Sequence, residues 1–212
     1  MFKHLVAYLR YSNNTKKNKY HMKKVSTLLV AVAFAGTAFA QTTWNIDKPH
    51  SKVGFSVAHL VVSEVDGNFK EFDGKVVSKA ADFNGADVEF TAKVASVNTE
   101  DEKRDGHLMS DDFFNAEKYP EIKFKGNLVK QGTKYVLKGN LTIRDVTKPV
   151  TLDVVYGGTA KAFGGEKAGF KINGKINRQD YNLKWSKTTE AGGLVVGDEV
   201  EITAKIELNK AA

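Results

Sequence analysis

The stretch EIKFKGNLVKQGTKYVLKGNLTI, residues 121–143, decides the fold class. Apolar or small residues occupy every second position on both sides of Gln131-Gly132: Ile122, Phe124, Gly126 and Leu128 before it, and Tyr135, Leu137, Gly139, Leu141 and Ile143 after it. Alternation with period two is typical of half-buried β-strands, and a glycine between two such runs marks a turn. The stretch therefore predicts two antiparallel strands that share one apolar face.

The same alternation recurs along the rest of the chain. It is found at residues 53–57, 88–94, 150–156, 168–176 and 200–208, and less regularly at 69–77. Further turns are predicted at Gly85, Gly157-Gly158, Gly164-Gly165 and Gly192-Gly193. We therefore expect an all-β fold, an antiparallel β-barrel of about eight strands, with a sandwich as the alternative. Glycines and alanines on the apolar faces, without aromatic girdles at the strand ends, argue against an outer-membrane barrel.

Residues 105–118 are the one segment that interrupts this alternation. Asp111-Asp112 precede Phe113-Phe114, and Pro120 follows, which predicts a short helical insert between strands. The apolar residues Leu108, Phe113 and Phe114 are candidates for a plug or gate at one barrel end, with simple capping of the core as the compatible alternative. The acidic run 100–102 is interpreted as a solvated connection.

The N-terminal region predicts export. Residues 22–40 combine Lys23-Lys24, a short apolar run and the ending Ala38-Phe39-Ala40, which is the pattern of a signal peptide. We expect cleavage after Ala40 and a periplasmic location; an uncleaved anchor is the alternative, although the apolar run is shorter than the roughly 18 residues of a membrane helix. Residues 1–21 either extend the basic region or lie upstream of the true start at Met22.

Removing this leader changes the charge of the chain. Seven of the 32 basic residues and none of the 25 acidic residues lie within residues 1–40. The remaining single domain, residues 41–212, is formally neutral and gives no indication of a nucleic-acid partner. The absence of cysteine excludes disulfides, thiol nucleophiles and thiolate metal sites.

Six segments give the chain a family resemblance. In this order, residues 44–60, 104–114, 119–124, 141–152, 177–183 and 196–208 resemble the YceI family. The resemblance implies a periplasmic, lipocalin-like barrel that holds a long polyisoprenoid or isoprenoid-quinone chain in its lumen, with a link to the envelope stress response or to isoprenoid metabolism. The chain has Asp145 and Asn182 where the family usually has glycine, and both residue types tolerate a positive φ, so we expect both turns to keep their shape.

Small residues on the apolar faces raise the question of a lumen. Glycines and alanines alternate there with phenylalanines, which leaves either an open channel or a filled core with bends at the glycines. The residues alone do not decide between these readings, and the resemblance favours the channel. The lumen candidates for lipid binding are Phe55, Val57, Phe90, Ala92, Phe124, Gly126, Gly139, Leu141, Ile143, Phe170, Ile172, Gly174 and Ala204.

Three basic residues lie near predicted strand ends, where a lipid head group would meet solvent. These head-group candidates are Arg144, Lys148 and Arg178, and ordinary surface charge is the alternative. Trp44 and Trp185 belong either to the lumen wall or to the core. Arg104, Asp105 and His107 form the densest polar cluster, which we expect to fix the insert through an Arg-Asp pair.

No catalytic pattern stands out. His50, His59 and His107 lack metal-ligand spacing, and no serine lies in a Gly-x-Ser-x-Gly elbow. We therefore predict a non-catalytic carrier or sequestering protein with no metal and no cofactor, whose ligand is an isoprenoid lipid. No transmembrane segment is predicted in the mature chain, and a homodimer is compatible with the sequence. The alternatives are a filled structural or interaction barrel, and an enzyme that acts on a lipid-linked substrate.

Overall fold

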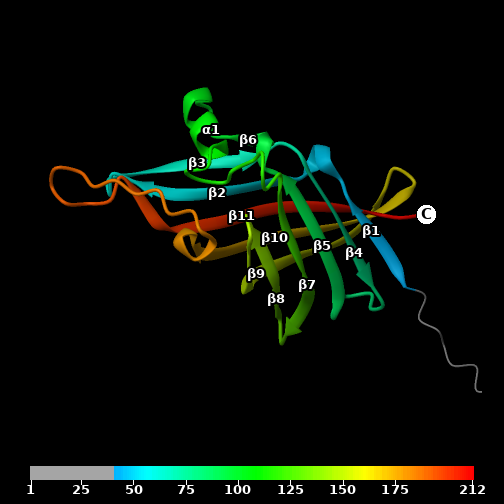
Figure 1. Ribbon diagram of the computed structural model, residues 1–212. Coiled ribbons are helices and arrows are strands. Elements are labelled where there is room, and N and C mark those ends of the chain that lie inside the picture. The colour runs from blue at the N-terminus through cyan, green and yellow to red at the C-terminus, as the bar shows by residue number, and fades with distance from the viewer. Residues whose placement is uncertain (1–40) are drawn as a thin grey trace, which may run out of the picture. The chain divides into compact units, whose positions relative to one another are not determined.

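The structure is a computed structural model that describes residues 41–212 (Figure 1). The predicted signal peptide and residues 1–21 lie outside the described residues. The strands and the α-helix are β1 (Thr42–Ile46), β2 (Lys52–His59), β3 (Ser63–Phe69), β4 (Phe72–Ser78), β5 (Ala86–Lys93), β6 (Val97–Asn98), α1 (Glu102–Met109), β7 (Glu121–Gln131), β8 (Lys134–Ile143), β9 (Val146–Ala162), β10 (Gly165–Asn177) and β11 (Val196–Lys210). Short 3-10 helices are η1 (Lys48–His50), η2 (Val94–Ser96) and η3 (Arg178–Tyr181). Within residues 41–212, no helix is long and apolar enough to cross a membrane.

Eight antiparallel strands form a closed barrel, which confirms the predicted fold class. Their order is β1-β4-β5-β7-β8-β9-β10-β11, and the ring closes because β1 pairs with both β4 and β11. Trp44 of β1 lies opposite Val76 on one side and Lys210 on the other. Closure leaves no open edge within the ring itself, and the sheet ends outside it at β3 and β6.

The strands that form this ring differ from the predicted ones. Residues 69–77 are not one strand, because Phe69 ends β3 and Phe72 begins β4 after a two-residue corner. The hairpin β2–β3 pairs with the first part of β11, with Val57 opposite Val200, whereas β1 takes the last part. β11 therefore changes partners along its length, and β2–β3 extends the wall beyond the ring (Figure 1).

The predicted turn at Gly157-Gly158 is wrong. β9 continues through both glycines to Ala162, and the register with β10 shifts between Gly169 and Phe170. Gly158 has φ +98°, a conformation that suits glycine in a β-bulge. The bulge accommodates one extra residue of β9, and the hairpin turn lies at Phe163-Gly164, overlapping the turn predicted at Gly164-Gly165.

The helical insert begins earlier than predicted. Asp101 caps α1 by accepting a hydrogen bond from the backbone N–H of Arg104 at 3.0 Å, so the helix starts inside the acidic run that we interpreted as a solvated connection. Residues 111–114 form turns rather than a helix. The expected Arg104–Asp105 pair is also wrong, because both side chains bind Thr99: Arg104 Nε donates to Thr99 Oγ1 at 2.8 Å, and Asp105 Oδ1 accepts from Thr99 N–H at 2.8 Å.

Candidate functional site

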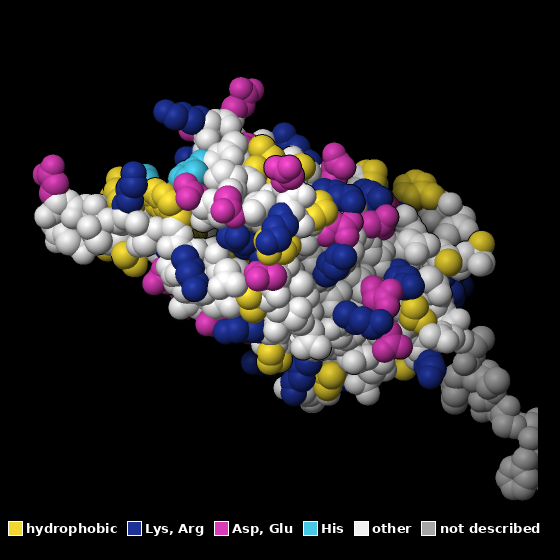
Figure 2. Space-filling model, in the orientation of Figure 1, with side chains coloured by type: hydrophobic (Ala, Val, Ile, Leu, Met, Phe, Trp, Pro, Cys, Tyr) yellow, Lys and Arg dark blue, Asp and Glu magenta, His cyan; other side chains and the backbone are white. Residues whose placement is uncertain are grey.

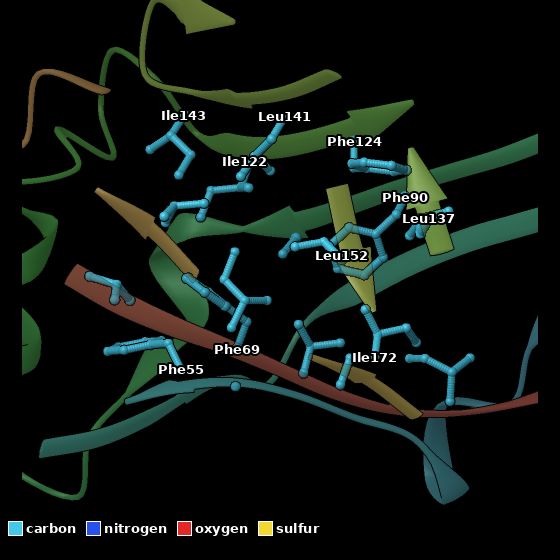
Figure 3. A pocket seen from close by; sticks show the side chains of 18 of the residues that line it. Phe55, Phe69, Phe90, Ile122, Phe124, Leu137, Leu141, Ile143, Leu152 and Ile172 are labelled. Atoms are coloured by element: carbon cyan, nitrogen blue, oxygen red, sulfur yellow. The ribbon is translucent and has the colours of Figure 1, made fainter. Parts of the chain in front are cut away.

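The barrel encloses a cavity of about 240 Å³ (Figure 3). Its wall consists of inward-facing apolar side chains, because each strand alternates one side chain toward the lumen with one toward solvent. The residues labelled in Figure 3 come from seven strands and surround the space: Phe55, Phe69, Phe90, Ile122, Phe124, Leu137, Leu141, Ile143, Leu152 and Ile172. The lumen is therefore a carbon-lined chamber.

Ten of the predicted lumen residues line this cavity: Phe55, Val57, Phe90, Ala92, Phe124, Leu141, Ile143, Phe170, Ile172 and Ala204. Further residues that were not predicted also line the cavity, among them Phe69, Leu137 and Leu152. The same period-two pattern could have identified Leu137 and Leu152, which share the inward face with Leu141 and Val154. Phe69 was hidden by the incorrect strand boundary at 69–77.

The glycines do not provide the open space predicted for them. A methyl group on Gly139 would lie 2.6 Å from Phe124 Cζ, and one on Gly126 would lie 2.8 Å from the same atom. On Gly174 it would collide with Leu152 Cδ2. Gly126, Gly139 and Gly174 thus lie beneath large side chains, and none of the three is among the residues that line the cavity. The prediction that these glycines leave open space is therefore wrong, because the side chains of Phe124 and Leu152 lie over the glycine backbone.

One end of the lumen is closed by Phe83, which the sequence analysis did not single out. Its side chain is only 1% exposed, although the residue lies in the connection between β4 and β5. The ring lies 5.0 Å from that of Trp44, 5.2 Å from Phe170 and 5.5 Å from Tyr156, measured between centroids. This aromatic cluster forms a floor, since offset and edge-on ring contacts pack densely. Trp44 therefore belongs to the core.

At the other end, the predicted gate residues bound the cavity. Leu108, Phe113 and Phe114 all line it, and both phenylalanines are buried. Phe113 packs against Trp185 at 5.5 Å between ring centroids, and the His107 ring contacts both, at 5.0 Å and 5.2 Å. His107 Nε2 also lies 2.9 Å from Asp112 Oδ2. This end is covered by the insert and a loop rather than by strands.

Arg178 lies near this cover, but its geometry leaves no hydrogen-bond donor for a ligand. The side chain is 2% exposed. Its guanidinium donates to the carbonyls of Gly197, Leu183, Trp185 and Val196 and to Asp198 Oδ1, at 2.6–3.3 Å. These bonds use all five N–H donors of the group. Burial lowers the pKa of Arg178. The residue therefore fastens the loop 183–198 to the barrel, which argues against the predicted head-group role.

The other two basic candidates also contact the cover. Arg144 donates to the carbonyl oxygens of Asp111, Phe113 and Asn182 at 2.8–3.1 Å, while its buried Nε has no partner among the described residues. Lys148 pairs with Asp180 at 2.8 Å and is partly exposed. Of the three candidates, Arg144 therefore retains a buried donor at the covered end.

The two turns with non-glycine residues meet at the same place. Asn182 has φ +61°, as expected, but in the other turn the positive φ belongs to Arg144 (φ +54°) and not to Asp145. Asn182 Nδ2 donates to Asp145 Oδ1 at 3.2 Å, and this bond lowers the pKa of Asp145. The two departures from the family pattern thus contact each other and tie the η3 turn to the β8–β9 turn.

A separate polar cluster lies on the outer surface. Ligand atoms of Asp47, His50 and Glu207 all lie within 4.8 Å of one another. Lys167 Nζ already contacts both carboxylates, at 2.8 Å from Asp47 and 2.6 Å from Glu207. Hydrogen bonds from Lys167 and then His50 lower the pKa of Asp47 from 3.8 to about 2. The cluster could offer three ligands to a metal only if Lys167 moved away.

The family follows from the sequence match. Residues 44–208, nearly all of the described part of the chain, match the model of the YceI-like domain. The chain belongs to the YceI-like family. A UPF0312 protein of Photorhabdus laumondii is 44% identical over 154 residues, covering 71% of this chain and 80% of that protein. A UPF0312 protein of Staphylococcus aureus is 34% identical over 170 residues, covering 79% and 98%.

Three solved structures have a similar fold. The Campylobacter jejuni YceI protein is 40% identical with a TM-score of 0.61, covering 78% of this chain and 96% of that one. BcnA of Burkholderia cenocepacia is 25% identical with a TM-score of 0.65, covering 76% and 98%. A structure described as a polyisoprenoid binding domain from Saccharophagus degradans shares the fold at 16% identity, with a TM-score of 0.58 and coverage of 79% and 98%.

Proposed function

We propose that this YceI-like barrel is a non-catalytic periplasmic protein that binds the chain of an isoprenoid lipid in its lumen, for carriage or sequestration. The observation that carries the proposal is the 240 Å³ cavity, walled by carbon and closed at one end by Phe83. Membership of the YceI-like family and the polyisoprenoid binding domain with the same fold support the ligand class. The predicted signal peptide, residues 22–40, supports the location.

The chemistry of the wall favours an apolar chain. Burying each CH₂ group contributes about 0.8 kcal/mol, so a polyprenyl chain or the tail of an isoprenoid quinone gains affinity without any charged contact. A polar ligand would lose its hydrogen bonds to water and find few in return. A thin, flexible chain also suits a narrow lumen in which Phe124 and Leu152 cover the glycines. Recognition would then depend mainly on shape.

The covered end is the proposed entrance. Phe83 and its aromatic neighbours form a closed floor, whereas Phe113 and Phe114 belong to turns outside the sheet. We place the head group beside Arg144, whose Nε lacks a protein partner, with Lys148 nearby at the surface. Arg178 instead holds the loop beside the entrance.

The decisive experiment is mass spectrometry of the protein as the cell exports it. The full chain is expressed with its leader, the mature product is purified without detergent, and native and denatured spectra are compared together with a lipid extract. A stoichiometric polyprenyl lipid or quinone that is lost on denaturation would support the proposal and identify the ligand. An empty protein that also refuses added prenyl lipids would instead indicate a filled structural barrel.

The enzyme alternative makes a different prediction. It requires turnover of a lipid-linked substrate that is lost when Asp105 or His107 is replaced, while binding is retained. In the structure Asp105 binds Thr99, and His107 packs between Phe113 and Trp185 beside Asp112. Both side chains are thus engaged in holding the cover, which favours the binding role over catalysis.

A further inference from the structure

An apolar tip projects from the hairpin between β2 and β3. The large hydrophobic side chains exposed among residues 41–212 are Leu60 (40%), Val61 (72%), Val62 (86%), Val155 (60%) and Phe163 (101%), and the first three are consecutive. We call residues 60–62 the apolar tip. Isolated exposed hydrophobic residues are ordinary, but a contiguous group at the end of a projecting hairpin marks an interaction site.

The backbone of the apolar tip is held in an unusual conformation. Leu60 has φ +54° and Val61 has φ +66°, values that glycine or asparagine adopts readily and a β-branched residue rarely does. Leu60 N–H donates to Val195 O at 3.0 Å, and Val62 N–H donates to His59 O at 3.2 Å. Such strain persists where the surrounding contacts enforce it and is concentrated at functional sites. Here it presents valine and leucine side chains to the outside.

The apolar tip lies at the covered end of the lumen. Val195, which accepts the bond from Leu60, belongs to the loop that Arg178 fastens through Leu183 and Trp185, and Trp185 packs on the gate residue Phe113. In Figure 1 this loop and the β2–β3 hairpin project together on one side, while the β9–β10 turn with Phe163 lies on the opposite side. The tip is therefore linked to the proposed entrance through the loop 183–198.

We propose that the apolar tip inserts into the interfacial layer of a lipid bilayer and holds the entrance of the lumen against the membrane. This inference rests on the proposed function, because an isoprenoid lipid resides in a bilayer and must leave it to enter the barrel. Shallow insertion of a few apolar side chains, about 5–10 Å deep, is the usual mode of interfacial anchoring. The lipid would then pass from bilayer to lumen along apolar side chains without crossing water.

The size and charge of the tip favour a bilayer over a protein partner. A stable protein interface buries about 800 Å² on each side, far more than one hairpin turn provides. Polar residues His59, Ser63 and Glu64 follow immediately on both sides, which limits the depth of insertion. Residues 59–64 contain no lysine or arginine, and Figure 2 shows charges of both signs interspersed over the visible face. Binding should therefore depend little on anionic lipids or salt.

The test is flotation of the purified mature protein with phosphatidylcholine vesicles. We expect the wild type to float, and we expect Val61→Asp/Val62→Asp to lower the vesicle partition coefficient about tenfold or more, because two carboxylates replace the anchoring side chains. Val155→Asp/Phe163→Asp is the matched control, since it also replaces two exposed hydrophobic side chains with carboxylates, at positions outside the tip, and should leave flotation unchanged. Both sites are exposed, and thermal melting checks that each variant is folded.

A second measurement separates docking from lipid binding. Prenyl lipid is supplied either in vesicles or in detergent micelles, and lumen occupancy is followed by native mass spectrometry. The Val61→Asp/Val62→Asp variant should load about tenfold more slowly from vesicles and equally from micelles.

A wild type that fails to float, or equal losses in the two variants, would overturn the docking proposal even if the lumen holds lipid. Conversion of a dimer to a monomer without a change in flotation would assign the tip to a second copy of the chain. A lumen that never takes up lipid would refute the proposed function. Flotation would still test whether the apolar tip binds a membrane.

Discussion

The ring of Phe124 on β7 lies over Gly139 on the neighbouring strand β8, where a methyl group would approach Phe124 Cζ to 2.6 Å. The same added group would lie 2.6 Å from Gly126 Cα. The Phe124 ring therefore packs directly on the backbone of Gly126 and Gly139, and no channel remains there. This relationship decides where the lumen is open, and it makes Gly139 a structural position rather than a ligand contact.

Gly139→Ala should destabilise the fold by about 2–3 kcal/mol, because backbone atoms as well as the Phe124 ring would have to move. Urea unfolding followed by circular dichroism measures the loss. Gly169→Ala is the matched control: it lies inside β10, and nothing is within 4 Å of the added methyl group. Equal stability of the two variants would contradict the packing of Phe124 over the glycines.

Ala204→Phe should block the lumen, because Ala204 on β11 lines the cavity opposite Ile172 and Val53. An added ring displaces several CH₂ contacts worth about 0.8 kcal/mol each, so affinity for a prenyl lipid should fall about tenfold or more. Titration monitored by native mass spectrometry measures the affinity. Thr203→Phe carries the same ring on the exposed face of the strand and should bind as the wild type does. Unchanged binding in a folded Ala204→Phe protein would refute a lumen site at this position.

Phe83→Ala should open the closed floor of the barrel. Loss of a buried phenylalanine that packs against Trp44, Tyr156 and Phe170 costs about 3–5 kcal/mol. Denaturant unfolding measures this cost, and the milder Phe83→Leu provides a folded variant if the alanine protein does not fold. Phe163→Ala removes the same ring at a fully exposed turn and should be nearly neutral. Comparable losses at both positions would show that Phe83 does not seal the lumen.

Arg178→Lys should loosen the loop 183–198, because an ammonium cannot reproduce five directed hydrogen bonds. We expect a loss of about 3 kcal/mol in stability and faster amide hydrogen exchange in this loop, measured by mass spectrometry. Lys175→Met, at an exposed position on β10 that pairs with Glu199, should change the exchange of the loop little. Normal protection of the loop in Arg178→Lys would restore Arg178 as a ligand candidate.

Acid should weaken the contact between Lys167 and Asp47. The pKa of Asp47 is lowered from 3.8 to about 2, chiefly by the hydrogen bond from Lys167. A carboxyl group with a lowered pKa stabilises the fold above its ordinary pKa, and this contribution is lost as the pH falls through the lowered value. The stability difference between the wild type and Lys167→Met should therefore be complete above a pH of about 5 and shrink between about 4 and 2. Urea unfolding across this range measures it, with exposed Lys171→Met as the control; a difference independent of pH would contradict the assignment.

The alternation of apolar residues determined much of this protein. Period two at residues 121–143 and in the other strands gave the antiparallel barrel and identified ten lining residues, because the pleat of a strand places alternate side chains on opposite faces. The six ordered segments gave the family. The alternation also placed Phe113 and Phe114 outside the strands, in the segment that covers the lumen. Strand alternation and its interruption depend on residues that are close together in the sequence, so the sequence alone is enough to predict them.

Only the tertiary structure decided where the lumen is open and how its ends are closed. Alternation cannot show that β1 closes the ring, that Phe124 covers Gly139, or that Phe83 reaches across the barrel from a loop. It also cannot show that Arg178 donates all its hydrogen bonds within residues 183–198, to four backbone carbonyls and to Asp198 Oδ1. These features depend on contacts between residues that are not neighbours in sequence. Strand pairing and side-chain volume determine such contacts. The alternation of apolar residues along one strand does not determine them.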